Sequence, residues 1–362
     1  MGEAQFEECD DLVYHYTDQF GLAGIIQRGE IWATNASYLK DVSEIANGVD
    51  YFGEHNAEAL KALIESRQLE SRFSERYRKV LEYLISEADR MFLKRDPKEY
   101  LFVSSFFDSC GLRNAKGSRF DPGDVLEQWR AYSKEGVGYS IGFQKKSLES
   151  HVAKWDGEDD YTTFCGGCIY SEEEKIERTT EILEILEPAC EIAMRVAYED
   201  WREYHRAVTS PRGSGTSTSE TTGLTRAEQA SKDRESVLDN LQLYWGRKMV
   251  SASFMKHEAF ATEHEWRIVR LAFTSSEQVQ FRPAKDGILP YSAISIANDD
   301  SPGHLTSGII RRIVIGPQSN VSRSKLERDA RSVKMLLEHY GLEIRSDSNQ
   351  NGVTIERSVL PC

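Results

Sequence analysis

Residues 256–270, with the sequence KHEAFATEHEWRIVR, contain the side chains best suited to chemistry in this chain. Interpreted as a β-strand, the segment alternates so that Glu263, Glu265 and Arg267 lie on one face and the residues between them on the other. Two carboxylates beside a guanidinium occur in polar active sites, and they also occur in ordinary ion-pair ladders. The residues alone leave both interpretations open.

A second candidate is His15, in the middle of residues 12–17, a short run rich in aromatic and β-branched side chains that predicts a strand. A buried core histidine explains this position as well as a functional one does. No two histidines have HxxxH or HExxH spacing, and Cys165-Gly-Gly-Cys168 lacks a second ligand pair at zinc-finger spacing. We therefore expect no metal site and interpret the CxxC as a turn.

Common catalytic and nucleotide-binding signatures are absent from the sequence. It has no GxSxG elbow for a hydrolase triad. Neither GxGxxG nor GxxxxGK[ST] occurs in a strand-to-helix setting, so neither a Rossmann site nor a P-loop is indicated.

Composition narrows the class of protein. The 362 residues are 40% hydrophobic and 29% charged, which is typical of a soluble globular protein. A net charge of −14 argues against a general electrostatic grip on nucleic-acid phosphates. The acidic N-terminus has no secretory signal, no window reaches 18 apolar residues, and the six cysteines are scattered. We expect a cytoplasmic protein with free thiols and no membrane segment.

The order of the expected elements favours an α+β fold, because strands and helices mix irregularly and do not alternate as βαβ units. The expected strands are 12–17, 31–34, 101–107, 138–143, 164–170, 256–270, 279–281, 294–296, 309–316, 342–346 and 353–358; the expected helices are 22–26, 57–93, 125–133, 171–205, 225–249 and 322–340. Residues 1–362 are predicted to form a single domain with helical insertions at 55–97 and 171–256. The second insertion contains a Ser-, Thr- and Gly-rich segment, 208–224, that we expect to be a mobile surface loop.

Several short motifs follow one another along the chain. They are His15-Tyr-Thr17, Ile31-Trp32, Tyr38-Leu-Lys-Asp41 with Glu44, Gln128-Trp-Arg-Ala-Tyr132, Gly138-Tyr-Ser-Ile-Gly-Phe143, Glu263-His-Glu-Trp-Arg267 and Ile313-Val-Ile-Gly-Pro317. In this order they resemble the bacterial family catalogued as domain of unknown function 2971. Lys40 is a departure, because the family usually has Asn there.

The outline of this family in turn resembles the ADP-ribosyltransferase superfamily, which implies a split mixed/antiparallel sheet and NAD as a substrate. Carried over residue by residue, the resemblance implies that His15 hydrogen-bonds the adenine-side ribose, with Tyr16 and Thr17 beside it. It implies that Trp32 or Tyr38 stacks on nicotinamide.

For the second motif, the resemblance implies that Glu265 is the catalytic glutamate and that Glu263 orients an acceptor. Cleavage of the N-glycosidic bond of NAD passes through an oxocarbenium-like state, which a fixed carboxylate stabilises. Arg267 would either pair with Glu265 as a structural ion pair or bind the pyrophosphate bidentately.

We therefore expect an enzyme that transfers ADP-ribose from NAD to a protein or nucleic-acid acceptor; a role as a toxin or antiphage effector rests on analogy alone. One alternative is an NAD glycohydrolase without a macromolecular acceptor. Another is a non-catalytic sensor or interaction module whose helical insertions bind a partner or form a homo-oligomer.

Overall fold

The chain divides into two compact units in the computed structural model. Residues Met1–Lys40, Tyr100–Cys168 and Ala259–Cys362 form the sheet unit, and Asp41–Glu99 and Ile169–Glu258 form the helical unit. Both predicted insertions fall in the helical unit, which begins earlier than each of them. The structure describes residues 11–39, 43–67, 71–92, 97–108, 121–132, 137–154, 161–195, 226–272, 279–284, 287–298, 301–306, 308–317, 323–346 and 352–360. The predicted loop at 208–224 lies outside these residues.

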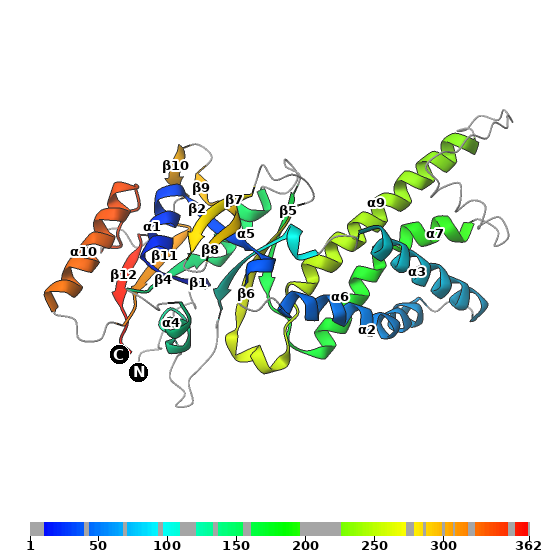
Figure 1. The fold of residues 1–362 in the computed structure, drawn as a ribbon, viewed down its shortest axis with the longest axis horizontal. Helices are drawn as coiled ribbons and strands as arrows, with labels where there is room; N and C mark the ends of the chain where they lie inside the picture. Colours follow the sequence, from blue (N-terminus) through cyan, green and yellow to red (C-terminus); the bar gives the residue numbers. More distant parts are fainter. Residues whose placement is uncertain are drawn as a thin grey trace, which may run out of the picture. The chain divides into compact units, whose positions relative to one another are not determined.

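The sheet unit contains a ten-stranded sheet and a separate β9–β10 pair, together with several helices (Figure 1). The sheet is mixed but largely antiparallel, with β11 and β12 pairing in parallel, which confirms the α+β class. Its elements are β1 (Leu12–Thr17), α1 (Gln19–Arg28), β2 (Glu30–Asn35), η1 (Ala36–Tyr38), β3 (Leu101–Phe107), α4 (Leu126–Tyr132), β4 (Tyr139–Gln144), α5 (Lys145–Lys154), β5 (Tyr161–Gly167), β6 (Glu265–Ala272), β7 (Gln280–Ala284), β8 (Gly287–Ser295), β9 (Ala297–Asn298), β10 (Ser301–Leu305), β11 (Ile310–Ile315), α10 (Arg323–His339) and β12 (Thr354–Arg357). Two 3-10 helices, η2 (Pro97–Tyr100) and η3 (Glu258–Glu263), contain residues of both units.

The sheet forks at β3. One edge of β3 pairs with β6 from Leu101 to Phe107. On the other edge, β2 pairs at Phe102 and Val103, whereas β1 pairs only at Phe107. Because a strand has two edges, β1 and β2 must share the second one. Among the described strands, none pairs with residues 104–106 on that edge, so β1 and β2 diverge from each other there.

Residues 256–270 do not form one continuous strand, contrary to the sequence prediction. The 3-10 helix η3 ends at Glu263, and β6 begins only at Glu265. Between them, His264 has φ 41°, a left-handed value that is uncommon for any residue but glycine, and its N–H donates to Ala261 O at 3.2 Å. Because this turn separates Glu263 from β6, Glu263 does not share a strand face with the charged residues of β6. The His264 carbonyl still accepts from the Asp108 N–H, just after β3, at 2.8 Å.

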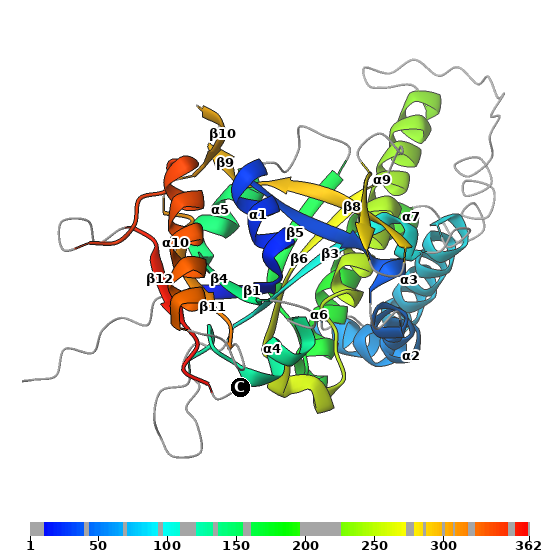
Figure 2. The same cartoon turned by 60° about the vertical axis from the view of Figure 1, so that its left-hand side comes forward.

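Two hydrophobic clusters cover the sheet unit. The larger contains Val13 and Phe106, together with buried residues of α1, α5 and α10; α1 and α10 lie side by side on it (Figures 1 and 2). The smaller contains Tyr14, Tyr16 and Phe107, with Trp129 of α4. Successive residues of β1 and of β3 therefore enter different clusters, as strand alternation requires.

The helical unit has its own hydrophobic core, to which five helices of the described residues contribute (Figure 1). Pro188 occupies the first turn of α7, where its missing N–H costs no helical hydrogen bond. In the described part of the chain, no helix is both long enough and apolar enough to cross a membrane. The helices are α2 (Ser43–Ser66), α3 (Ser71–Phe92), α6 (Glu172–Glu184), α7 (Glu187–Arg195) and α9 (Arg226–Ala252).

Two glycines of α2 provide a matched test of packing in the helical unit. A Cβ added at Gly48 would press against the backbone carbonyl of Ala252, whereas one at Gly53 would meet nothing within 4 Å. We expect Gly48→Ala to lower the free energy of unfolding by about 1–3 kcal/mol, the usual effect of overpacking. Gly53→Ala should raise it by about 0.5–1 kcal/mol, since alanine favours the helix. Urea denaturation followed by circular dichroism measures both, and equal effects would contradict the close packing of α2 on α9.

Candidate functional site

The two motifs implicated by sequence lie on strands separated by a single strand. Tyr14 of β1 is opposite Phe107 of β3, and Phe107 is opposite Glu265 of β6. At a spacing of about 4.8 Å between neighbouring strands, the backbones of Tyr14 and Glu265 are about 10 Å apart. The fold thus brings segments from opposite ends of the chain to one place.

The side chains of these motifs do not all point to the same face. Phe107 and Tyr14 belong to the smaller hydrophobic cluster, and Phe107 is directly opposite Glu265. Glu265 and Arg267, two residues further along β6, therefore point toward that cluster. His15 points toward the larger cluster, where its ring centroid is 5.3 Å from that of Phe106.

His15 is located in the fork. Its Nδ1 is 3.0 Å from the carbonyl oxygen of Ser105, one of the β3 residues without a strand partner on this edge. Because a carbonyl only accepts, Nδ1 carries the proton and donates, which leaves Nε2 as an acceptor in the neutral ring. Burial lowers the pKa of His15, the bond to Ser105 partly opposes this, and the positive charge of Arg282 lowers the pKa further.

The lowered pKa of His15 gives a pH dependence with a defined sign. Below its unfolded pKa of about 6.5, the unfolded chain binds a proton that the folded chain does not. The contribution of neutral His15 to stability is therefore complete above about pH 6.5 and decreases as the pH falls toward the folded pKa. We expect the stability difference between wild type and His15→Gln to shrink between about pH 7.5 and about pH 5.5. Urea titrations at both pH values measure it, and a constant difference would contradict a buried neutral ring.

Glu265 and Arg267 form a bidentate ion pair inside the sheet unit. Arg267 donates from Nε to Glu265 Oε1 at 2.7 Å and from Nη2 to Oε2 at 2.8 Å. Glu265 is 9% exposed and Arg267 is 2% exposed. This geometry fixes both the position and the orientation of the carboxylate. Of the two roles predicted for Arg267, it adopts the ion pair.

Tyr16 has an architectural position. It is buried, donates from its hydroxyl to Pro122 O at 2.6 Å and accepts from the Val125 N–H at 3.0 Å. Burial raises its pKa well above the ordinary value for tyrosine. Its ring packs edge-on against Trp129, with centroids 4.8 Å apart. Tyr16 therefore anchors the segment that leads into α4, on the opposite face of β1 from His15.

The remaining site residues predicted from the sequence differ in how much of each side chain is exposed to solvent. Thr17 is half-buried, with its hydroxyl close to Gly21, and Glu263 is half-buried at the end of η3. Tyr38 ends η1, directly after β2, and is 52% exposed. Trp32 is half-buried, with its ring centroid 5.1 Å from that of Tyr291.

Two arginines beside Trp32 were not identified from the sequence. The guanidinium carbon of Arg28 is 5.4 Å from the centroid of the Trp32 ring, and that of Arg282 is 5.5 Å away. Arg28 ends α1 and Arg282 belongs to β7, so only the tertiary fold brings them together. The one available signal was the sequence QFRPA, which as a strand places Arg282 on the opposite face from its two neighbours. This signal is weak.

The CxxC segment is not the turn that we expected, because Cys165 to Gly167 belong to β5 and pair with β6. Cys168 follows the strand and donates its backbone N–H to Glu265 O at 2.8 Å. Within the described ranges, no group of three or more His, Cys, Asp or Glu side chains could hold a metal ion.

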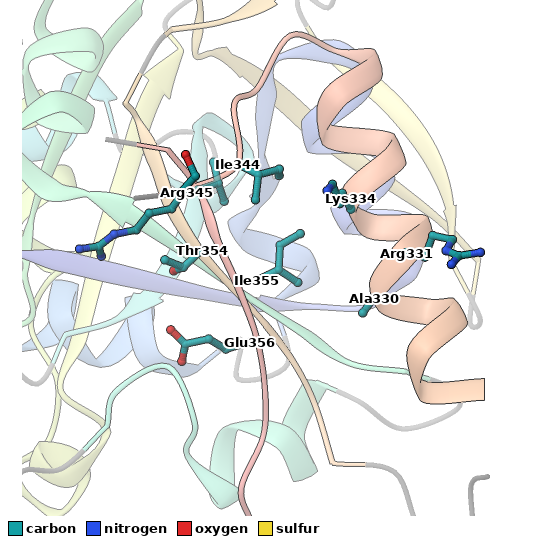
Figure 3. Close-up of a pocket in the computed structure, with 10 residues that line it drawn as sticks. Ala330, Arg331, Lys334, Ile344, Arg345, Thr354, Ile355 and Glu356 are labelled. Carbon is teal, nitrogen blue, oxygen red and sulfur yellow. The ribbon is translucent and has the colours of Figure 1, made fainter. Parts of the chain in front are cut away.

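A pocket of about 680 Å³ lies between α10 and the C-terminal segments of the sheet unit (Figure 3). Figure 3 shows Lys334 and Arg331 on α10, across the pocket from Glu356, which accepts from Arg312 Nη2 at 2.6 Å. None of the site residues predicted from the sequence lines this pocket. Its lining comprises Ala330, Arg331, Lys334, Ile344, Arg345, Ser346, Val353, Thr354, Ile355 and Glu356.

Comparison with known proteins supports one of the sequence inferences. No curated protein and no solved structure matches the chain. The family model described as "Protein of unknown function (DUF2971)" matches residues 128–268, a range that runs from α4 to β6 and includes both Glu265 and Arg267. The resemblance read from the sequence is thereby confirmed over residues 128–268, where the chain matches the DUF2971 family model.

Proposed function

We propose that this protein cleaves NAD and transfers ADP-ribose to a protein or nucleic-acid acceptor, using the forked region of an ADP-ribosyltransferase-like sheet. One observation carries the proposal: His15 and Glu265, far apart in the sequence, lie on strands separated only by β3. A bound NAD must be held at both ends to react, and a spacing of about 10 Å between these strands is within its reach.

Glu265 is the group that we assign to the bond-breaking step. When the N-glycosidic bond breaks, nicotinamide leaves with the bonding electron pair, and positive charge develops on the ribose. A carboxylate already fixed by Arg267 stabilises that charge without reorganising. The acceptor then forms a bond to the ribose carbon and loses its proton, and we assign its orientation to the half-buried Glu263.

His15 and Tyr38 are assigned to binding. Residues 104–106 of β3 have no described strand partner on the edge facing β1, and we assign the acceptor nitrogen of neutral His15, beside them, to a ribose hydroxyl. Of the two residues suggested for stacking on nicotinamide, Tyr38 is the more exposed, and we assign the role to it.

Incubation of the purified full chain with NAD labelled in its adenosine half, with and without cell lysate, tests the proposal. Transfer gives free nicotinamide and a labelled protein or nucleic acid. Free ADP-ribose without a labelled macromolecule would instead indicate NAD hydrolysis. Neither product in any condition would remove the enzymatic proposal.

The rival from another class is a non-catalytic interaction module. It is favoured by the helical unit, which has a hydrophobic core of its own and need not serve catalysis. In that case, substitution of Glu265 would leave cellular activity intact, while substitution of an exposed apolar residue on α9 such as Leu243, 51% exposed, would abolish it. Cellular activity here means growth arrest on expression, which a toxin or antiphage effector would cause.

A further inference from the structure

The arginines beside Trp32 form a cationic cluster that the proposed chemistry does not yet use. Arg282 donates from Nη2 to Thr34 Oγ1 at 3.1 Å, and Arg28 is 3.5 Å from the hydroxyl of Tyr291. Within the described part of the chain, neither guanidinium forms an ion pair with a carboxylate. Trp32 contacts both of them through its ring and thereby holds them in place.

Buried donors in the cluster have no acceptor. The Nε atom of Arg282 and the Nε1 atom of Trp32 are both buried without a hydrogen-bond partner among the described residues. Native structures leave few buried polar groups unsatisfied, and an uncompensated buried charge is more costly still. Burial accordingly lowers the pKa of Arg282, and the negative charge of Asp18 only partly opposes this. Asp18 is itself engaged, because its carboxylate caps α1 by accepting from the Phe20 and Gly21 N–H groups at 2.9 Å.

These observations fit a site that binds an anionic group of another molecule. We propose that Arg282 and Arg28, held on the ring of Trp32, bind the diphosphate of a dinucleotide. Guanidinium groups suit phosphate oxygens because their planar N–H donors bind two oxygens at once. The positive charge of Arg282 also acts on His15, which places the cluster in the neighbourhood of the fork.

The inference rests on the proposed function for the identity of the dinucleotide, but not for the anion site. It gives Trp32 a different task from stacking on nicotinamide, because its ring already contacts Arg28, Arg282 and Tyr291. Arg282 is then a positioning residue for the diphosphate, and the reacting ribose is left to Glu265.

Calorimetric titration of the full chain with inorganic pyrophosphate, ADP and adenosine tests the site without any chemistry. We expect wild type to bind pyrophosphate and ADP, and Arg282→Met to weaken both by about tenfold or more, since a charge-assisted phosphate contact is lost. Arg282→Lys should restore part of the affinity, because it returns the charge but not the bidentate geometry. Arg331→Met, on the exposed face of α10, is the matched control for loss of one positive charge and should leave binding unchanged.

The outcomes separate this inference from the proposed function. If pyrophosphate binding depends on Arg282 but NAD is never cleaved, the anion site stands and the enzymatic proposal fails. If NAD is cleaved while Arg282→Met changes neither pyrophosphate affinity nor the KM for NAD, the anion site is overturned. Equal loss of binding in Arg282→Met and Arg331→Met would also overturn it, because a general charge effect would then explain the result.

Discussion

Glu265→Gln is expected to lower the rate of nicotinamide release from NAD by about two to three orders of magnitude, the usual effect of removing one preorganised electrostatic group. Glutamine keeps the volume of the side chain and one oxygen for Arg267, but it removes the negative charge that would face the developing oxocarbenium ion. Single-turnover measurement of nicotinamide release gives the rate of the chemical step directly. The KM for NAD should change much less than kcat, because the lost interaction belongs to the transition state.

A charge-pair control distinguishes this effect from a general loss of structure. In the helical unit, the Asp89 carboxylate accepts a hydrogen bond from the buried Lys248 at 2.8 Å. Asp89→Asn therefore also removes the negative charge that is paired with a buried cation. We expect it to leave nicotinamide release unchanged. If Glu265→Gln keeps wild-type activity while remaining folded, Glu265 is a structural residue only, and its assigned role is wrong.

Arg267→Met is expected to lower the free energy of unfolding by about 3–5 kcal/mol, the largest stability effect that we anticipate for one substitution. Methionine fills much of the same space, but it leaves Glu265, which is 9% exposed, without its bidentate partner. Removing one partner of a buried pair destabilises far more than the pair itself contributes, because the remaining charge is uncompensated. Urea denaturation followed by tryptophan fluorescence measures the change.

The double variant Glu265→Leu with Arg267→Met tests that reasoning. With both charges gone, most of the lost stability should return, since a well-packed apolar pair often replaces a buried ion pair without loss. The double variant should nevertheless release no nicotinamide, which would separate the catalytic role of Glu265 from its structural one. A loss of less than about 1 kcal/mol in Arg267→Met would indicate that solvent reaches the pair, as at exposed ion pairs.

Local signals in the sequence predicted much of the secondary structure. The first helix is an example: Asp18 caps α1 and Gly29, with φ 64°, ends it, and both effects depend only on neighbouring residues. The predicted helix at 322–340 is present as α10, and Gly341, with φ 76°, follows it. Capping and helical periodicity act over a few residues, so one sequence is enough to detect them.

The error at residues 256–270 has a related cause. Alternation predicted one strand through Glu263 and Glu265, but His264 takes a left-handed conformation and the strand begins one residue later. Periodicity alone does not distinguish a strand from a short 3-10 turn that ends beside one. The two carboxylates consequently belong to different elements, and Arg267 binds Glu265 bidentately.

The sequence by itself determined the α+β class, the resemblance to the DUF2971 family model and the residues of the two motifs. Only the tertiary structure decided that β1 and β2 share one edge of β3, that Glu265 is bound by Arg267, and that Arg28 and Arg282 meet at Trp32. The physical reason is the range of the interactions. Helix caps and strand propensities are set by adjacent residues, whereas strand order, ion pairing across a fold and burial depend on segments that meet only after the chain has folded.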